Sequence, residues 1–155
     1  MKNKNLSFMT QAAMIAAIYV VLTYIFAPFS FGEVQVRISE ALTILPIFTP
    51  AAIPGLFAGC LIGNILGGAI LPDIVFGSIA TLIGAFFTWK LREQKPVVAT
   101  FPPIISNIII VPFVLRYGYG VTLPIPFMML TVGIGEVISC TVLGLIVYGA
   151  LKKYK

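Results

Sequence analysis

The stretch FMTQAAMIAAIYVVLTYIFA, residues 8–27, determines the fold class of this chain, because it contains no charged side chain. A helix of about 20 apolar residues is the element that crosses a lipid bilayer. The remaining sequence has the same character, since 59% of all residues are hydrophobic, 10% are charged and the mean hydropathy is +1.07. Soluble domains typically hold about 25% charged residues. The composition therefore predicts an all-α integral membrane protein.

Hydropathy and length divide the chain into six predicted transmembrane helices within one membrane domain, residues 1–155. The predicted ranges are 8–27, 39–48, 51–69, 72–91, 97–115 and 125–151. The form of segment 39–69 stays open, because Pro46, Pro50 and Pro54 each remove a backbone donor and break or kink a helix. One kinked span or a re-entrant pair of short helices are both compatible with this segment.

The basic residues indicate the orientation in the membrane. Eight of the ten lysines and arginines lie in three clusters, which are Lys2 and Lys4, then Lys90, Arg92 and Lys95, then Lys152, Lys153 and Lys155. Cytoplasmic loops of membrane proteins carry an excess of such residues. Six crossings place all three clusters, and both termini, on the cytoplasmic side of the cell membrane. The net charge of +5 is thus a topology signal and gives no support for nucleic-acid binding.

One polar segment, GEVQVRISEAL at residues 32–42, interrupts the apolar pattern. Its apolar residues alternate with polar ones, which predicts an extended segment on the outer side that leads into the second helix. Ser39 is the candidate N-cap of that helix. Arg37 and Glu40 lie three residues apart, so they either pair with each other or contact a ligand.

Ionisable and amide side chains inside the predicted spans are candidates for substrate binding, because a central charge costs about 2.5–3.5 kcal/mol in a membrane helix. The candidate substrate-binding residues, including those of the outer segment, are Glu33, Gln35, Arg37, Glu40, Asn64, Asp73, Asn107 and Glu136. Structural roles compete with this interpretation. Glu136 could form an ion pair with Arg37 or Arg116. Asn64 and Asn107 could form hydrogen bonds to neighbouring helices. Asp73 could stabilise the N-terminus of its helix through the helix dipole.

Catalytic and metal-binding patterns are missing from the sequence. It contains no histidine, and Cys60 and Cys140 are too far apart for a zinc motif. There is no nucleophile–base set and no phosphate-binding glycine loop followed by lysine. We therefore expect no enzyme activity, no metal and no cofactor on this chain, and two cysteines buried as small packing residues.

Three stretches resemble a known family. VQVRISEALTILP at 34–46 and GNILGGAILPDIVFGSIATLIGA at 63–85 are similar to the queuosine-precursor branch of the membrane S components of energy-coupling factor (ECF) transporters. AAMIAA at 12–17 resembles the alanine pattern general to S components. The resemblance implies six helices around a substrate pocket near the extracellular face, with the first outer loop as a lid.

The resemblance also implies partners and a substrate. The alanine face of the first helix, Ala12, Ala13, Ala16 and Ala17, would dock a membrane T component that binds two cytoplasmic ATPases, and these partners would use the ATP. The cargo would be a 7-deazaguanine derivative or queuine. Alternatives are an S component for a different vitamin, a stand-alone secondary transporter, or a channel for another small solute.

The candidate side chains suit a guanine-like ring. A carboxylate accepts the donor pair of ring N1–H and exocyclic amine, a task assigned to Glu136 or Glu40. The O6 edge needs donors, which Arg37, Asn64 or Asn107 supply. A cationic aminomethyl substituent would use a second carboxylate, either Glu33 or Asp73, and aromatic rings can stack on the base.

Overall fold

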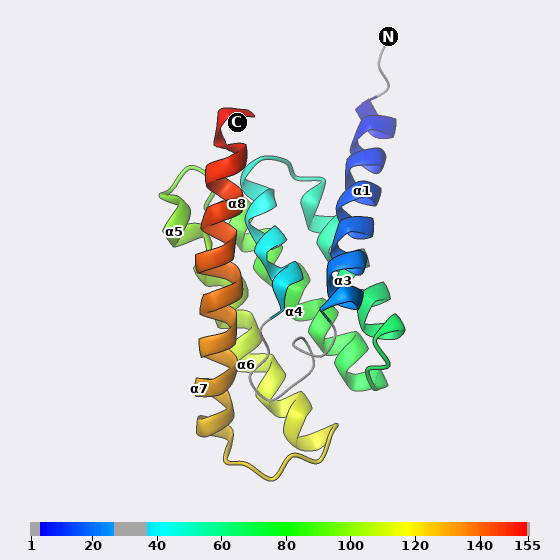
Figure 1. Cartoon of the computed structure of the whole chain (residues 1–155), viewed down its shortest axis with the longest axis vertical. Helices are drawn as coiled ribbons and strands as arrows, with labels where there is room; N and C mark the ends of the chain where they lie inside the picture. Colours follow the sequence, from blue (N-terminus) through cyan, green and yellow to red (C-terminus); the bar gives the residue numbers. More distant parts are fainter. Residues whose placement is uncertain (1–3, 27–36, 155) are drawn as a thin grey trace.

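The computed structural model describes residues 4–26 and 37–154, and this part of the chain is helical and contains no strand (Figure 1). The longer helices are α1 (Lys4–Ile25), α3 (Ala52–Leu66), α4 (Leu71–Lys90), α6 (Phe101–Tyr117), α7 (Ile125–Glu136) and α8 (Gly144–Leu151). Shorter elements are the 3₁₀ helix η1 (Ile38–Ile47), α5 (Pro96–Ala99), the π-helical η2 (Val137–Leu143) and the 3₁₀ turn η3 (Lys152–Tyr154).

Four helical stretches of the described part are long and apolar enough to cross a membrane. They are Asn5–Ile25, Leu71–Lys90, Pro96–Tyr117 and Ile125–Leu151, the last formed by α7, η2 and α8 in one continuous rod. Two of the six predicted ranges, 39–48 and 51–69, correspond to the shorter apolar helices Ile38–Ile47 and Ala52–Leu66. The structure therefore supports a multi-pass membrane protein with four helices long enough to span a bilayer. The other two predicted spans correspond to helices that are shorter than a full span.

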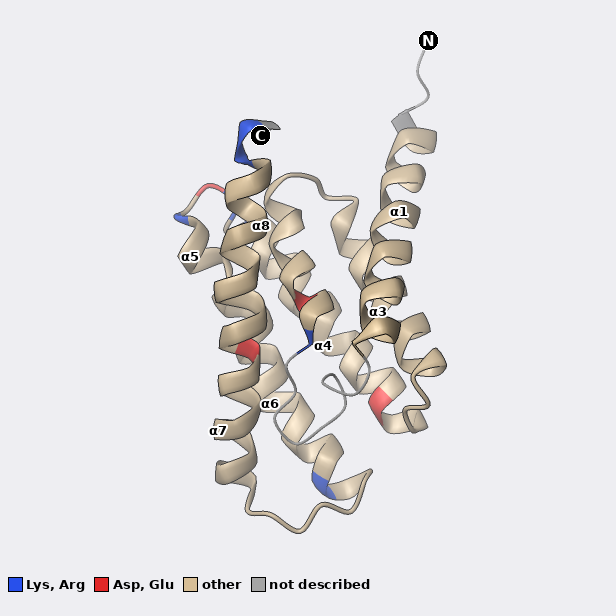
Figure 2. Ribbon diagram, in the orientation of Figure 1, with Lys and Arg blue, Asp and Glu red and all other residues tan. Residues whose placement is uncertain are grey.

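Basic residues are concentrated at one end of the helix bundle. The first turn of α1, the connection from α4 to α5 and the last turn of the chain lie at one end of the bundle, and the connection from α6 to α7 lies at the other (Figure 1). Basic residues gather at the first of these ends, at the C-terminal turn and beside α5 (Figure 2). One end of the bundle thus has the charge that membrane proteins place beside a cytoplasmic surface.

Helices α1 and α3 pack closely because α3 presents glycine at every fourth position. Gly55, Gly59 and Gly63 face α1, and a Cβ atom added to Gly59 would lie 2.7 Å from Tyr19 Cβ and 3.1 Å from the Ala16 carbonyl oxygen. Small residues at this spacing let two membrane helices approach until their backbones are in contact. The approach fixes Tyr19 at the centre of the molecule, where it is fully buried.

The short helix η1 occupies the middle of the bundle, between α1 and α3 on one side and η2 and α8 on the other (Figure 1). Seven of its ten residues are buried. A 3₁₀ helix rises about 2.0 Å per residue against about 1.5 Å for an α-helix, so these ten residues reach about 20 Å. This short, mostly apolar helix thereby carries Ser39, Glu40 and Thr43 deep into the protein, with Pro46 near its end.

The expected N-cap of this helix is wrong. Arg37, with extended backbone, occupies the N-cap position of η1, and no side chain caps the helix. Ser39 lies inside η1, where its hydroxyl accepts a hydrogen bond of 2.9 Å from Thr23 of α1. Enclosure by α1 gives the Ser39 hydroxyl a partner on another helix, which local sequence rules do not consider.

Helix α6 packs against α4 through a second close contact. A Cβ atom on Gly84 of α4 would lie 2.6 Å from Pro103 Cα, and Ser106 donates a 2.9 Å hydrogen bond to the Ala80 carbonyl. Pro112 lies inside α6 without ending it. The proline pair at the start of α6 and the glycine of α4 therefore set how near Asn107 comes to the centre.

Candidate functional site

Polar side chains from six helical elements meet in the interior of the bundle. The fully or nearly fully buried members are Tyr19, Thr23, Arg37, Ser39, Glu40, Asn64, Asn107, Glu136 and Ser139. They come from α1, the start of η1, α3, α6, α7 and η2. Buried polar groups are retained in membrane interiors chiefly where they bond each other or line a functional cavity, so we treat this polar cluster as the candidate site.

Arg37 is held by α3. Its guanidinium donates a 2.9 Å hydrogen bond to Asn64 Oδ1 and lies 3.8 Å from Cys60 Sγ. The same guanidinium lies 5.9 Å from the centroid of the Tyr19 ring. Asn64 in turn donates to the backbone carbonyl of Asp73 at 3.4 Å. A chain of bonds therefore links the start of η1 through α3 to the start of α4.

Glu40 is held by α1. The Tyr19 hydroxyl donates a short hydrogen bond to Glu40 Oε1. Glu40 Oε2 has no hydrogen-bond partner among the described residues, although it is buried. The expected pairing of Glu40 with Arg37 is not formed, because Arg37 donates to Asn64 and Glu40 accepts from Tyr19. One carboxylate oxygen is thus oriented by tyrosine and the other is available.

Glu136 is held by α6 and by its own helix. Asn107 Nδ2 donates 3.1 Å to Glu136 Oε2, and the Cys140 thiol donates 3.2 Å to the same oxygen. The Asn107 amide also donates 2.9 Å to the Pro103 carbonyl. Neither Arg37 nor Arg116 forms an ion pair with Glu136; Arg116 is exposed and lies near the Leu123 carbonyl at the end of α6. The structural alternative of a Glu136–Arg pair is therefore excluded.

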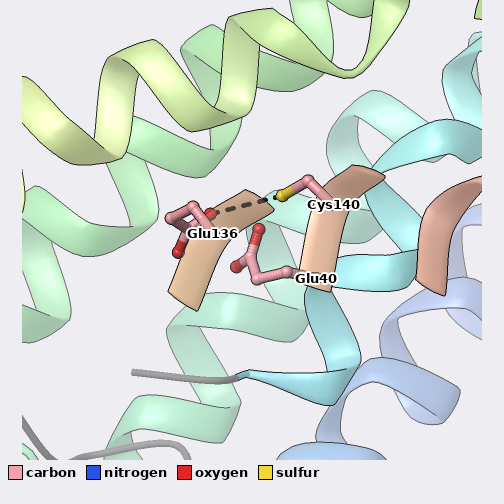
Figure 3. Close-up of side chains that lie close together, drawn as sticks. All are labelled: Glu40, Glu136 and Cys140. Atoms are coloured by element: carbon pink, nitrogen blue, oxygen red, sulfur yellow. Dashed lines mark hydrogen bonds between the residues drawn. The ribbon is translucent and has the colours of Figure 1, made fainter. Parts of the chain in front are cut away.

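Glu40 and Glu136 approach each other across the bundle. One oxygen of each carboxylate and Cys140 Sγ lie within 4.8 Å of one another, and all three residues are buried (Figure 3). Glu136 ends α7, and Cys140 lies in the π-helical η2 that follows. Short π-helical segments within α-helices are frequent at functional sites. Neither the π segment nor the meeting of these carboxylates could be read from the spacing of residues.

Asp73 lies at the edge of the polar cluster. Its side chain, in the first turn of α4, accepts a 2.6 Å hydrogen bond from the Tyr119 hydroxyl, and that hydroxyl accepts from Ile70 N–H at 3.3 Å. Partial burial, followed by the hydrogen bond to the Asp73 carboxylate, raises the pKa of Tyr119 to about 12. Asp73 thus joins the α6–α7 connection to α4 while its backbone carbonyl contacts Asn64.

The predicted site residues fall into three groups. The structure brings together Arg37, Glu40, Asn64, Asn107 and Glu136, and it places Asp73 beside them. Glu33 and Gln35 lie outside the described residues. Sequence reasoning missed Tyr19, Thr23 and Cys140, of which Cys140 carried a signal because it is four residues after Glu136 and so on the same helix face.

The four alanines of α1 do not form one surface. Ala12 and Ala16 are partly buried and face the glycines of α3, since added Cβ atoms at Gly55 and Gly59 would lie 2.8 and 3.1 Å from their carbonyl oxygens. Ala13 and Ala17 are exposed. Half of the predicted docking pattern is therefore used for packing within the chain.

Apolar grooves also mark the outer surface. Two lie along the seam of α4 and α6 and one along the seam of α6 and α7, lined mainly by Ile, Phe and Leu side chains. None of them contains Arg37, Glu40, Asn64 or Glu136. Their apolar lining suits lipid chains, so the polar cluster remains the candidate for a polar ligand.

Known proteins show where the chain belongs. A sequence model of the QueT transporter family matches residues 9–153. The chain is also 33% identical over 84 residues to the queuosine precursor transporter QueT of Lactococcus lactis subsp. cremoris (strain MG1363). This alignment covers 53% of the chain and 48% of that relative, so about half the length of the relative is spanned. No solved structure matches the chain significantly.

Proposed function

The chain belongs to the QueT transporter family, and from this premise we propose that it is the substrate-binding S component of an ECF importer for a queuosine precursor. The proposed cargo is a 7-substituted 7-deazaguanine or queuine. The name of the Lactococcus relative, a queuosine precursor transporter, supports this substrate class. The observation that carries the proposal is the buried set of donors and acceptors around Arg37, Asn64, Glu40 and Glu136.

The proposed binding mode uses both kinds of group. A buried carboxylate accepts the N1–H and exocyclic amine of a guanine-like ring in a charge-assisted, two-pronged bond. The Arg37 guanidinium and the Asn64 amide would donate to the O6 edge, as donors do in base recognition. The Tyr19 ring lies beside Arg37 and offers an aromatic face for stacking.

The proposed topology places the basic end of the bundle in the cytoplasm. Lys90, Arg92, Lys95, Lys152 and Lys153 would lie inside, and the α6–α7 connection would lie outside. The chain would cross six times, with η1 and α3 as short crossings shielded by the longer helices. The substrate site would then open toward the extracellular side.

Energy for transport would come from partners. The sequence contains no phosphate-binding glycine loop, so ATP would be hydrolysed by two cytoplasmic ATPases held by a membrane T component. Ala13 and Ala17 form the exposed part of the alanine pattern, and close approach of another helix needs such small side chains. We therefore place the T-component contact on Ala13 and Ala17 rather than on Ala12 and Ala16.

Binding to the purified protein tests the substrate. In lipid nanodiscs we expect saturable binding of 7-aminomethyl-7-deazaguanine or queuine, and none of adenine, whose edge lacks the N1–H and amine pair. Asn64→Leu removes one hydrogen-bond partner of Arg37 and should weaken binding about tenfold or more. Failure of every deazaguanine to bind the wild-type protein would refute the proposed cargo.

Co-purification tests the partners. With the T component and the ATPases expressed together, the wild-type chain should form a complex, and Ala13→Leu should prevent it while leaving substrate binding intact. Uptake by the chain alone, without any ATPase, would instead support a stand-alone secondary transporter.

A further inference from the structure

An apolar groove on the seam of α4 and α6 ends beside a lysine at the basic end of the bundle. Its lining includes Phe87 and Leu91 near the end of α4, Ile105 and Ile109 of α6, and Lys90, the last residue of α4. The α6 side of the lining extends over residues 102–110, which at about 1.5 Å per residue is a length of about 12 Å. One leaflet of a bilayer contributes about 15 Å of hydrocarbon. This Lys90 groove therefore extends through most of one leaflet.

The Lys90 groove is open to the surroundings of the bundle and apolar along its length. Ile105 and Ile109 each have an exposed fraction of 55%. The groove also contains the Ser106 hydroxyl, which donates hydrogen bonds of 2.9 Å and 3.2 Å to the carbonyl oxygens of Ala80 and Pro103. Because this hydroxyl is already used inside the bundle, the side chains of the groove offer a ligand an apolar surface with one charged group at its end.

Aromatic rings position two cations at the end of the groove. Lys90 Nζ lies 5.3 Å from the ring centroid of Phe86 and 5.4 Å from that of Trp89. The Arg92 guanidinium lies 4.4 Å from the Trp89 ring, and Arg92 Nη1 donates 2.9 Å to the Trp89 carbonyl oxygen. Tryptophan is enriched at membrane–water interfaces, at the level of the lipid headgroups. The basic end of the groove therefore lies where a phospholipid carries its phosphate.

The charge at this end of the groove is positive. Residues 90–95 contain Lys90, Arg92 and Lys95 against the single acidic residue Glu93, a net charge of +2 (Figure 2). Glu93 is 82% exposed and lies 3.9 Å from Arg92, and no acidic side chain of the described residues forms an ion pair with Lys90. Aromatic faces attract the Lys90 ammonium without neutralising it, and its three N–H groups suit an anion. Charge complementarity therefore favours a negatively charged ligand.

The other groove of the same seam provides an internal comparison. It extends toward the opposite end of the bundle, where its lining includes Pro72, Phe76 and Tyr117, and it contains no charged side chain. Both grooves can hold an acyl chain, but the Lys90 groove alone of the two combines an apolar channel with a cation at its end. This combination matches a molecule with an anionic head and an apolar chain.

We propose that the Lys90 groove is a binding site for an anionic phospholipid. The phosphate group lies at Lys90 and Arg92, and one acyl chain follows the groove past Phe87 and Ile105. Basic pockets between membrane helices are known to bind anionic headgroups. The site is separate from the polar cluster, so the inference goes beyond the proposed function and does not depend on which cargo is bound.

Native mass spectrometry of the purified full chain tests the headgroup. The probes are phosphatidylglycerol and phosphatidylcholine with identical acyl chains, added at equal concentration to the detergent-solubilised protein. One basic residue near a headgroup favours an anionic lipid about fivefold, so the wild-type chain should retain phosphatidylglycerol about 5- to 30-fold better. Lys90→Gln should lower this preference about fivefold, and Lys90→Arg should keep it. Lys152→Gln, at an exposed lysine of η3 outside the groove, is the control and should leave the preference unchanged.

A second pair of variants tests the groove in the same assay. Ile105→Trp fills the groove without changing its charge, so it should reduce the retention of phosphatidylglycerol. Ile146→Trp is the matched control, because Ile146 of α8 is 64% exposed and lines none of the three grooves.

Three results would overturn the lipid site. Equal retention of both lipids by the wild-type chain would remove the headgroup preference, and equal effects of Lys152→Gln and Lys90→Gln would assign that preference to the whole basic end. Unchanged retention in Ile105→Trp would exclude the groove. A dimer without bound lipid that Ile105→Trp dissociates would instead assign the groove to a second copy of the chain.

Discussion

The substitution Gly59→Ala tests whether the close contact of α1 and α3 positions the site. The new methyl group would lie 2.7 Å from Tyr19 Cβ and 3.1 Å from the Ala16 carbonyl oxygen. Both atoms belong to or adjoin the backbone of α1, so the helices must separate to relieve the overlap. Overpacking of this kind costs about 1–3 kcal/mol, whereas alanine gains about 0.5–1 kcal/mol over glycine inside a helix. The net result is a loss of up to about 2.5 kcal/mol of unfolding free energy.

Gly149→Ala is the matched control, because no atom lies within 4 Å of a Cβ added to Gly149 of α8. The same gain in helix propensity applies there without overlap, so this variant should be stabilised by about 0.5–1 kcal/mol. Unfolding in detergent, followed by circular dichroism, should show opposite signs for the two variants. Gly59→Ala should also weaken ligand binding, because Tyr19 moves away from Glu40. Equal stabilisation by both substitutions would refute the contact between α1 and α3.

Three further predictions concern single hydrogen bonds. Tyr119 should ionise above the ordinary tyrosine pKa of about 10, with a pKa of about 12. Its hydrogen bond to Asp73 should therefore contribute fully to stability below about pH 10, and this contribution should be lost as the pH rises through about 12. An ultraviolet titration in which Tyr119→Phe still shows the same number of late-ionising tyrosines would contradict this. Tyr19→Phe leaves Glu40 without its donor, which should cost about 1–3 kcal/mol of stability in chemical unfolding, and an unchanged midpoint would argue against the bond. Ser106→Ala removes a bond to α4 and should cost only about 0.6 kcal/mol in the same assay; a loss above about 2 kcal/mol would contradict a simple interhelical bond.

Much of the architecture could be predicted from hydropathy. The predicted range 72–91 is matched by α4 at Leu71–Lys90, and 125–151 is matched by the rod Ile125–Leu151. Runs of apolar residues bounded by charge or proline fix these helices locally, so no tertiary information is needed. Segment 39–69 could not be settled in this way, because prolines leave several helix geometries open. Its resolution into a buried 3₁₀ helix and α3 depends on the helices around it.

The candidate site shows the same division. Glu40 and Glu136 could be identified from the sequence, because placing a charged side chain inside a membrane segment costs free energy at that position. This cost depends on the single residue and not on its neighbours in space. Their mutual approach was not predictable, since 96 residues separate them along the chain. The partners Tyr19 and Cys140 were missed because a tyrosine or a cysteine in an apolar helix is usually only a packing residue.

The sequence by itself determined that this chain is a helical membrane protein, where its long helices lie and which polar residues need an explanation. These properties follow from the transfer of individual side chains between water and lipid, which composition and spacing record. Tertiary structure alone decided that Arg37 bonds Asn64, that Glu40 faces Glu136, and that only half of the alanine pattern remains exposed. Such pairings depend on how closely helices approach, and glycines such as Gly59 and Gly84 set that distance only when the opposing helix is in place.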